Sequence, residues 1–207
     1  MAEPQPNLLI LYTDQQSRWT IGAYGSPEGA RIGTPNIDRL AAEGVRFDNF
    51  FTNAAVCTPS RGCFFTGHYP HRHGAYHNNI PINPDEVTLG RTLADAGWQT
   101  GYLGKWHLDT PGAVGRPGWI PPDRAMGFND CRFMFNSSHA KGVTERADGP
   151  PELHPDPERG RYMTDWLADK AIEFISGRRD RPFAFVVGIP DPHEPYRVRE
   201  PYASLFR

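Results

Sequence analysis

A chain of 207 residues is long enough for one sizeable hydrophobic core, so its length favours one domain over two. The 22 lysines and arginines nearly balance the 24 aspartates and glutamates, and this balance argues against a nucleic acid or an anionic membrane as a partner. The three cysteines are sparse and odd in number, which argues against a disulfide framework, so we expect reduced thiols.

The N-terminal segment Met1–Asn7 contains an acidic residue and two prolines but no basic residue. The apolar run that follows it, LLILY, is too short for the hydrophobic region of a signal peptide or for a membrane span. The sequence therefore predicts a cytoplasmic protein without a membrane partner.

Strands are predicted at four places in the chain. Residues 7–13 and 182–189 are continuous apolar runs, a pattern typical of strands that are buried on both faces of a parallel sheet. Residues 99–103 form a third candidate strand, and residues 45–50 form a short fourth one. The last two each follow a predicted helix, so the order along the chain suggests strand–helix alternation.

The helices are marked by their boundary residues. Thr34 is placed to cap a helix that begins at Pro35 and ends at Gly44. A second helix is predicted over residues 89–96, and an amphipathic helix is predicted over residues 162–176.

Residues 110–161 are rich in proline, glycine and charge, so they predict long loops with one short strand near residues 131–135. The chain as a whole predicts an α/β fold: a layered, largely parallel sheet flanked by helices. In such sheets ligands bind beyond the carboxyl ends of the strands. The polar residues found just past three predicted strand ends are Asp14 and Gln15, Lys105 and His107, and Asp191 and His193.

The stretch CTPSR at residues 57–61 is followed by Thr66 and Gly67. This pattern resembles the signature of the type I sulfatases of the alkaline phosphatase superfamily, in which the cysteine is oxidised after translation to formylglycine. The resemblance extends to LLILYTDQQ, GYLGKWHL and DPHEPY, in the order that the family has them. It implies an alkaline phosphatase/sulfatase-like fold and a sulfuric ester hydrolase.

The resemblance also implies how Cys57 would act. A formylglycine aldehyde hydrates to a geminal diol, of which one hydroxyl attacks sulfur beside a divalent cation and the other expels the sulfate afterwards. The cation lowers the pKa of the nucleophile and offsets charge on the sulfate oxygens. A formylglycine-generating enzyme or an equivalent maturase is then a required partner.

The family's first metal-binding pair matches Asp14 and Gln15, with a further oxygen from the side chain derived from Cys57. Hard oxygen ligands favour Ca²⁺, with Mg²⁺ and Mn²⁺ as alternatives. Many sulfatases have two aspartates at this place, whereas this chain has Gln15 and Gln16 after Asp14. That departure leaves the identity of the metal open.

Further catalytic roles follow from the resemblance, residue by residue. Arg61 would hold the diol and the turn into the helix. Lys105 and His107 would contact the sulfate oxygens and a hydroxyl of the formylglycine. His193 would touch the leaving-group oxygen and act as a general acid.

Cys63 has a different environment in the sequence, because four histidines lie near it. They are His68, His71, His73 and His77. A zinc site is one interpretation, but the region contains no CxxC pair. We therefore expect Cys63 to be a buried core residue.

Two other functions remain open from the sequence. A phosphonate monoester or phosphodiester hydrolase shares the CxPSR motif and the Asp-Gln pair, although Lys105 and His107 favour sulfate. The family also has a second metal pair, another lysine and a C-terminal subdomain downstream of the HxPY segment. Residues 1–207 thus resemble the N-terminal portion of a sulfatase catalytic domain, truncated at the C-terminus.

An inactive truncated fragment that binds its metal weakly is accordingly the third hypothesis. The substrate is expected to be a small-molecule or carbohydrate sulfate ester. The choice among such esters, and the oligomeric state, are not decided by the sequence.

Overall fold

The computed structural model of the chain describes residues 5–109, 118–177 and 179–205. The contacts divide the chain into a larger unit, Met1–Asp14 with Asn53–Arg207, and a smaller unit, Gln15–Thr52. Among the described residues, no helix is both long enough and apolar enough to cross a membrane.

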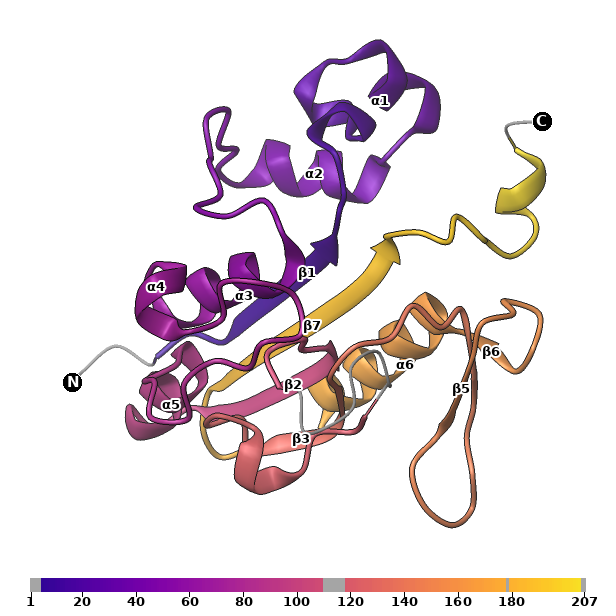
Figure 1. The fold of residues 1–207 in the computed structure, drawn as a ribbon. Helices are drawn as coiled ribbons and strands as arrows, with labels where there is room; N and C mark the ends of the chain where they lie inside the picture. Colours follow the sequence, from indigo (N-terminus) through magenta and orange to yellow (C-terminus); the bar gives the residue numbers. More distant parts are fainter. Residues whose placement is uncertain (1–4, 110–117, 178, 206–207) are drawn as a thin grey trace. The chain divides into compact units, whose positions relative to one another are not determined.

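The larger unit is built on a sheet of four strands in the part of the chain that the structure describes (Figure 1). Their order across the sheet is β1 (Leu8–Asp14), β7 (Phe183–Pro192), β2 (Gln99–Lys105) and β3 (Asp130–Phe135). All three pairings are parallel, so the predicted parallel sheet is confirmed. The carboxyl ends of these strands therefore meet at one edge of the sheet.

Strand β1 lies at the edge of this sheet, beside β7. The prediction that it is buried on both faces is wrong here, because Leu8, Leu9 and Leu11 are exposed. Strand β7 lies between two neighbours, and residues Phe183–Val187 are all buried as predicted. Two similar apolar runs thus differ in burial because their positions in the sheet differ.

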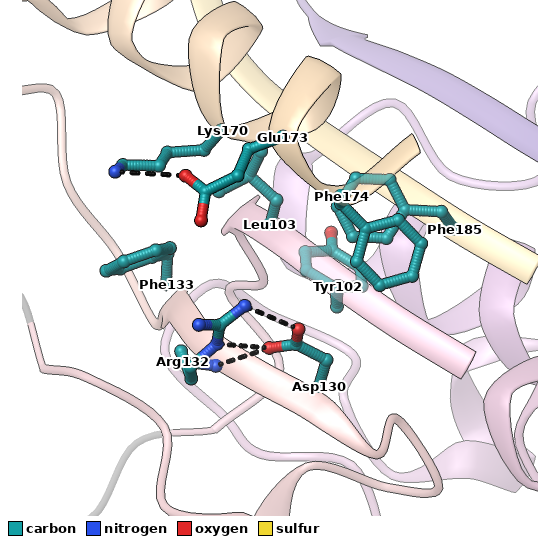
Figure 2. A pocket seen from close by; sticks show the side chains of 9 residues that line it. All are labelled: Tyr102, Leu103, Asp130, Arg132, Phe133, Lys170, Glu173, Phe174 and Phe185. Carbon is teal, nitrogen blue, oxygen red and sulfur yellow. Dashed lines mark hydrogen bonds and ion pairs between the residues drawn. The ribbon is translucent and has the colours of Figure 1, made fainter. Parts of the chain in front are cut away.

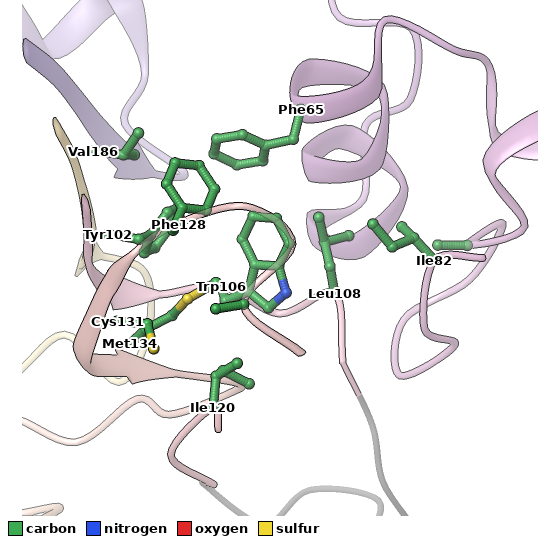
Figure 3. Close-up of a cluster of buried hydrophobic side chains, with 12 residues drawn as sticks. Phe65, Ile82, Tyr102, Trp106, Leu108, Ile120, Phe128, Cys131, Met134 and Val186 are labelled. Atoms are coloured by element: carbon green, nitrogen blue, oxygen red, sulfur yellow. The ribbon is translucent and has the colours of Figure 1, made fainter. Parts of the chain in front are cut away.

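Alternate residues of the central strands supply two hydrophobic clusters, one on each face of the sheet. Tyr102 packs with Phe65 and Trp106 in the first cluster, which Figure 3 shows. Leu103, the next residue, packs with Leu167 in the second cluster. The sheet therefore forms the middle of a layered α/β structure.

Helices cover the two faces. Helix α6 (Met163–Ser176) supplies the second cluster and matches the predicted helix at residues 162–176. Helix α3 (Cys57–Thr66) supplies the first through Phe65, and α4 (Pro70–His73) follows it. Helix α5 (Leu89–Asp95) confirms the prediction for residues 89–96.

Between β3 and α6 the described residues form an antiparallel sheet of three short strands in the order β5-β4-β6. These strands are β4 (Gly142–Thr144), β5 (Glu152–His154) and β6 (Arg161–Tyr162). The prediction of loops was wrong for this part of residues 110–161, and residues 110–117 lie outside the described residues. Strands of two or three residues are too short to show the alternation that identifies a strand in a sequence.

The smaller unit contains α1 (Pro27–Ile32) and α2 (Pro35–Glu43). Helix α2 begins at Pro35 as predicted, but Thr34 does not cap it with its side chain. Thr34 Oγ1 instead accepts a hydrogen bond from the Gly22 amide and donates one to Asp38.

Short 3₁₀ helices complete the described chain: Arg18–Thr20, Gly22–Tyr24, Pro122–Arg124 and Tyr202–Ser204.

The prediction of a strand over residues 45–50 is wrong. These residues are described as irregular chain, and Val45, Phe47 and Phe50 are exposed. A segment becomes a strand only where a neighbouring strand pairs with its backbone hydrogen-bonding groups, and none of the described strands does so here.

Candidate active site

The residues predicted from the strand ends meet because β2 and β7 approach each other very closely. Gly104 and Gly188 lie opposite each other in the two strands. Gly104 has φ +92°, and a Cβ atom on it would lie 2.2 Å from the Gly188 carbonyl oxygen. Only glycine fits this place. The next residue, Lys105, thereby ends β2 at the carboxyl edge of the sheet.

Arg61 connects helix α3 to that edge, and its side chain is 2% exposed. Its Nη1 donates a hydrogen bond of 2.6 Å to the Lys105 carbonyl oxygen, which also accepts one of 2.6 Å from the Tyr102 hydroxyl. Its Nη2 lies 3.3 Å from Asp14 Oδ2. This guanidinium therefore lies inside the protein.

A buried carboxylate lies between two cations in this site. Asp14 Oδ2 is 2.6 Å from Lys105 Nζ and 3.3 Å from Arg61 Nη2. Burial alone would raise the pKa of Asp14, but Lys105 and Arg61 outweigh it and hold the pKa below its usual value. Burial lowers the pKa of Lys105, and Asp14 opposes that change. Two cations against one carboxylate leave an excess of positive charge.

Cys57 begins α3 and lies against the same carboxylate. Its Sγ is 3.7 Å from Asp14 Oδ1, the oxygen on the other side of the carboxylate from the two cations. Burial raises the pKa of the Cys57 thiol, and Asp14 adds to the increase while Lys105 opposes it. The unmodified side chain is therefore a protonated thiol and a weak nucleophile at neutral pH.

His107 is buried beside this group with φ +60°. Its Nε2 lies 3.3 Å from the side-chain oxygen of Asn79, an acceptor, so the hydrogen is on Nε2. Its Nδ1 is buried and finds no hydrogen-bond partner among the described residues. Burial, with Lys105 and Arg61, lowers the pKa of His107 to about 3. The ring is thus neutral and presents an unused acceptor.

His193 follows β7 and is held in a network of hydrogen bonds. Lys141 Nζ donates to the His193 carbonyl oxygen at 3.0 Å and to Asp191 Oδ1 at 2.5 Å. Asp191 Oδ2 accepts hydrogen bonds from the hydroxyls of Tyr162 and Thr164, each at 2.6 Å. The loop that carries His193 is therefore tied to β6 and α6.

His139 is a further member of the group. Its Nε2 lies 3.2 Å from Lys105 Nζ, and its ring centroid lies 3.8 Å from that of His193. Neither His139 nor Lys141 was predicted as a site residue. Both follow the predicted strand at residues 131–135, so the rule that polar residues past a strand end belong to the site could have identified them.

Two further residues that the sequence analysis named are Gln15 and Cys63. Gln15 follows Asp14 directly in the chain and is the first residue of the smaller unit. Cys63 is only partly buried, which corrects the expectation of a core residue, and its Sγ lies 3.7 Å from His73 Nε2. No cluster of three or more His, Cys, Asp or Glu that could hold a metal occurs among the described residues. The zinc interpretation therefore has no support there.

The structure also has a small cavity away from this site, between α6 and the strands β2 and β3 (Figure 2). Its apolar wall includes Phe133 and Phe174. Its charged groups pair with one another, since Arg132 contacts Asp130 at 2.9 Å and Lys170 contacts Glu173. We assign no chemistry to it.

Comparisons of this chain with family models, known sequences and solved structures agree with one another. The model of the Sulfatase family matches residues 6–207. The N-acetylglucosamine-6-O-sulfatase of Bacteroides thetaiotaomicron is 32% identical over 203 residues, which are 98% of this chain and 33% of that protein. Arylsulfatase A of Bos taurus is 40% identical over 201 residues, 89% of this chain and 37% of that protein.

Among solved structures, yidJ of Bacteroides fragilis resembles this chain with a TM-score of 0.78 at 28% identity. The similarity covers 93% of this chain and 45% of that one. The chain thus spans less than half the length of each of these three proteins.

Proposed function

Because this chain belongs to the Sulfatase family, we propose that it carries the nucleophile and the anion-binding part of a site that hydrolyses organic sulfate esters. The observation that carries the proposal is the buried group Asp14, Arg61 and Lys105 against Cys57. Its excess positive charge is fixed in position before a substrate arrives, which is the arrangement that stabilises charge developing on sulfate oxygens.

Oxidation of Cys57 to formylglycine is part of the proposal. The thiol itself is protonated and weakly nucleophilic, whereas a hydrated aldehyde would place two hydroxyls at the beginning of α3. His107 Nδ1, which is buried and lacks a partner in the described residues, is suited to accept a hydrogen bond from one of them. A maturase that performs the oxidation is then a necessary partner.

Sulfatases in general use a divalent metal together with the formylglycine. Asp14 provides a carboxylate oxygen, the kind of ligand that such an ion binds. Its Oδ1 faces residue 57, whereas Lys105 and Arg61 contact Oδ2. We propose that Asp14, Gln15 and an oxygen on residue 57 hold it, with Ca²⁺ as the ion and Mg²⁺ or Mn²⁺ as alternatives. Bound there, the ion would supply positive charge to the sulfate oxygens.

His193 is proposed to donate a proton to the leaving-group oxygen. Its Nδ1 lies 2.8 Å from the Glu194 carbonyl oxygen and so carries a hydrogen, and the proton that passes to the leaving group would be a second one, carried on Nε2. We propose a sulfated carbohydrate as the substrate, because a relative with 32% identity is an N-acetylglucosamine-6-O-sulfatase. Small-molecule sulfate esters are the broader class.

The test compares kcat/KM for a matched aryl sulfate and phenyl phosphonate ester after production with a formylglycine-generating enzyme. We expect sulfate to be preferred, and Lys105→Ala to lose about tenfold or more, the scale of one charge-assisted contact. Lys170→Ala is the matched control, because Lys170 pairs with Glu145 and Glu173 away from the site and should keep full activity.

A clear preference for phosphonate would contradict the proposal and favour the phosphonate monoester hydrolase alternative. Turnover by a longer form of the protein but not by residues 1–207 would favour the third hypothesis, an incomplete fragment.

A further inference from the structure

The loop between β3 and β4 holds His139 in a fixed place. Asn136 Oδ1 accepts a hydrogen bond of 3.0 Å from the Asp109 amide, and the Lys141 amide donates one of 2.7 Å to the His154 carbonyl oxygen. The other loop residues that are buried are Ser138 and Ala140. His139 is therefore presented to the site by a loop that is anchored on both sides of it.

The two contacts of His139 are made by different parts of its ring. Nε2 lies 3.2 Å from Lys105 Nζ, whereas the ring lies against His193 with 3.8 Å between centroids and 38° between planes. His139 thus joins the lysine and the histidine to which the proposed function assigns separate roles.

The chemistry of the contact to Lys105 determines the tautomer of His139. An ammonium group can only donate, so Nε2 of His139 must accept and the hydrogen of the neutral ring must be on Nδ1. Burial, with Lys105 and His193 close by, lowers the pKa of His139 to about 4, so the ring is neutral at pH 7. Of the three hydrogens of Lys105, one is directed to Asp14 and one to His139, which leaves one for a substrate oxygen.

We propose that His139 is a positioning residue of the sulfate-ester site, orienting the Lys105 ammonium through Nε2 and the His193 ring through its own ring face. The proposal rests on the proposed function for the roles of Lys105 and His193. The two contacts can be separated by substitution: His139→Phe keeps a ring against His193 but has no acceptor, and His139→Gln keeps an acceptor but has no ring.

The first experiment does not need activity. Histidine side chains of the 207-residue chain are labelled with ¹⁵N, and their tautomers are read by long-range ¹H–¹⁵N spectra. We expect the Nδ1–H tautomer at His139, a change in its Nε2 shift in Lys105→Met, and no change at exposed His71. His139→Gln should move the His193 ring signals through loss of the neighbouring ring current, and His139→Phe should retain a ring-current shift there.

The second experiment uses kinetics on the chain with Cys57 oxidised. His139→Gln should reduce kcat/KM about tenfold or more for a sugar sulfate, whose alkoxide needs a proton on leaving, and by less than about threefold for 4-nitrophenyl sulfate. His139→Phe should reduce kcat/KM about tenfold for both substrates, because it disturbs the charge on the sulfate oxygens. His71→Gln is the control for both and should match the wild type.

Unchanged His193 ring signals in His139→Gln would overturn the proposal, as would an equal kinetic loss for both substrates in that variant. The expected spectra together with no sulfatase turnover by either the wild-type chain or a longer form of the protein would support the positioning contacts and contradict the proposed function instead. A purely structural role for His139 would lower the thermal midpoint of both variants without the difference between substrates.

Discussion

At Cys57, burial and the Asp14 carboxylate raise the pKa of the thiol, and Cys63 and Cys131 also have pKa values raised by burial. All three cysteines are therefore unreactive thiols at neutral pH, and ionisation does not distinguish among them. What distinguishes Cys57 is its position as the first residue of α3, within the CTPSR sequence and against Asp14.

We expect a maturase to convert Cys57, and neither Cys63 nor Cys131, to formylglycine. Peptide mass spectrometry of the chain co-produced with a formylglycine-generating enzyme tests this prediction. The peptide that contains Cys57 should lose sulfur and gain an aldehyde that reacts with hydrazide reagents. Cys57→Ala is the control, and the remaining two cysteines should stay unmodified in it. An intact Cys57 thiol under these conditions would contradict the prediction.

Strands β2 and β7 show how an element can position a site. The Gly104–Gly188 approach brings the end of β2 against β7, and the Lys105 carbonyl oxygen then accepts hydrogen bonds from Arg61 and Tyr102. Arg61 in turn contacts Asp14 at the end of β1. One guanidinium thus connects the ends of β1 and β2, while the glycine pair brings β2 against β7.

Gly104→Ala should lower the free energy of unfolding by about 3 kcal/mol, because its Cβ would overlap the Gly188 carbonyl and φ is +92°. Gly97→Ala is the matched control: its φ is +95°, but a Cβ there would meet nothing within 4 Å. We expect about 1 kcal/mol for that variant, the cost of a left-handed alanine alone. Urea unfolding at constant pH measures both. Equal losses would show that the close approach contributes nothing.

In the residues that the structure describes, the parallel sheet ends in an edge strand with exposed apolar side chains. Strand β1 pairs with β7 on one side, and Leu11 is 57% exposed. An exposed edge strand with apolar side chains is a template for pairing with another chain. The edge of β1 is therefore the expected site of self-association for the polypeptide of residues 1–207.

Residues 1–207 should self-associate at high concentration, and Leu11→Lys should reduce this association, because a charge on the edge opposes strand pairing. Val87→Lys is the matched control, since Val87 is also 57% exposed but lies outside the strands. Sedimentation velocity over a concentration series provides the measurement. Association that Leu11→Lys and Val87→Lys reduce equally would indicate an effect of net charge alone.

Histidines with lowered pKa values also make the stability of the protein depend on pH. The pKa values of His107 and His139 are about 3 and about 4 in the folded protein, below the ordinary value of 6.5. Between pH 6.5 and these values, the unfolded chain binds protons that the folded protein does not. Stability is therefore lost as the pH falls through this range, and it is fully present above pH 6.5.

We expect the free energy of unfolding to fall from pH 7.5 to pH 5.0, and the fall to be smaller in His139→Gln than in the wild type. Chemical denaturation at the two pH values measures this difference. His71→Gln is the control, because its exposed ring should leave the fall unchanged. A fall of the same size in His139→Gln and the wild type would show that this ring does not contribute.

Local patterns in the sequence were sufficient for much of the fold and part of the site. Helices at residues 35–44, 89–96 and 162–176 are marked by periodicity and boundary residues, which act within a few residues of each other along the chain. The CTPSR motif identified the family for the same reason, since its spacing is local. The rule for strand ends also selected Asp14 and Lys105, which the structure places 2.6 Å apart.

The tertiary structure alone decided which apolar runs find partners and which polar groups meet. Residues 45–50 contain Val45, Phe47 and Phe50 and β1 is mostly apolar, yet the former pair with none of the described strands and the latter lies at an edge. His139 and Lys105 are 34 residues apart in the chain and 3.2 Å apart in space. Strand pairing, burial and electrostatic contact depend on distances across the fold, and these distances follow from the packing of the whole chain, not from any segment of it.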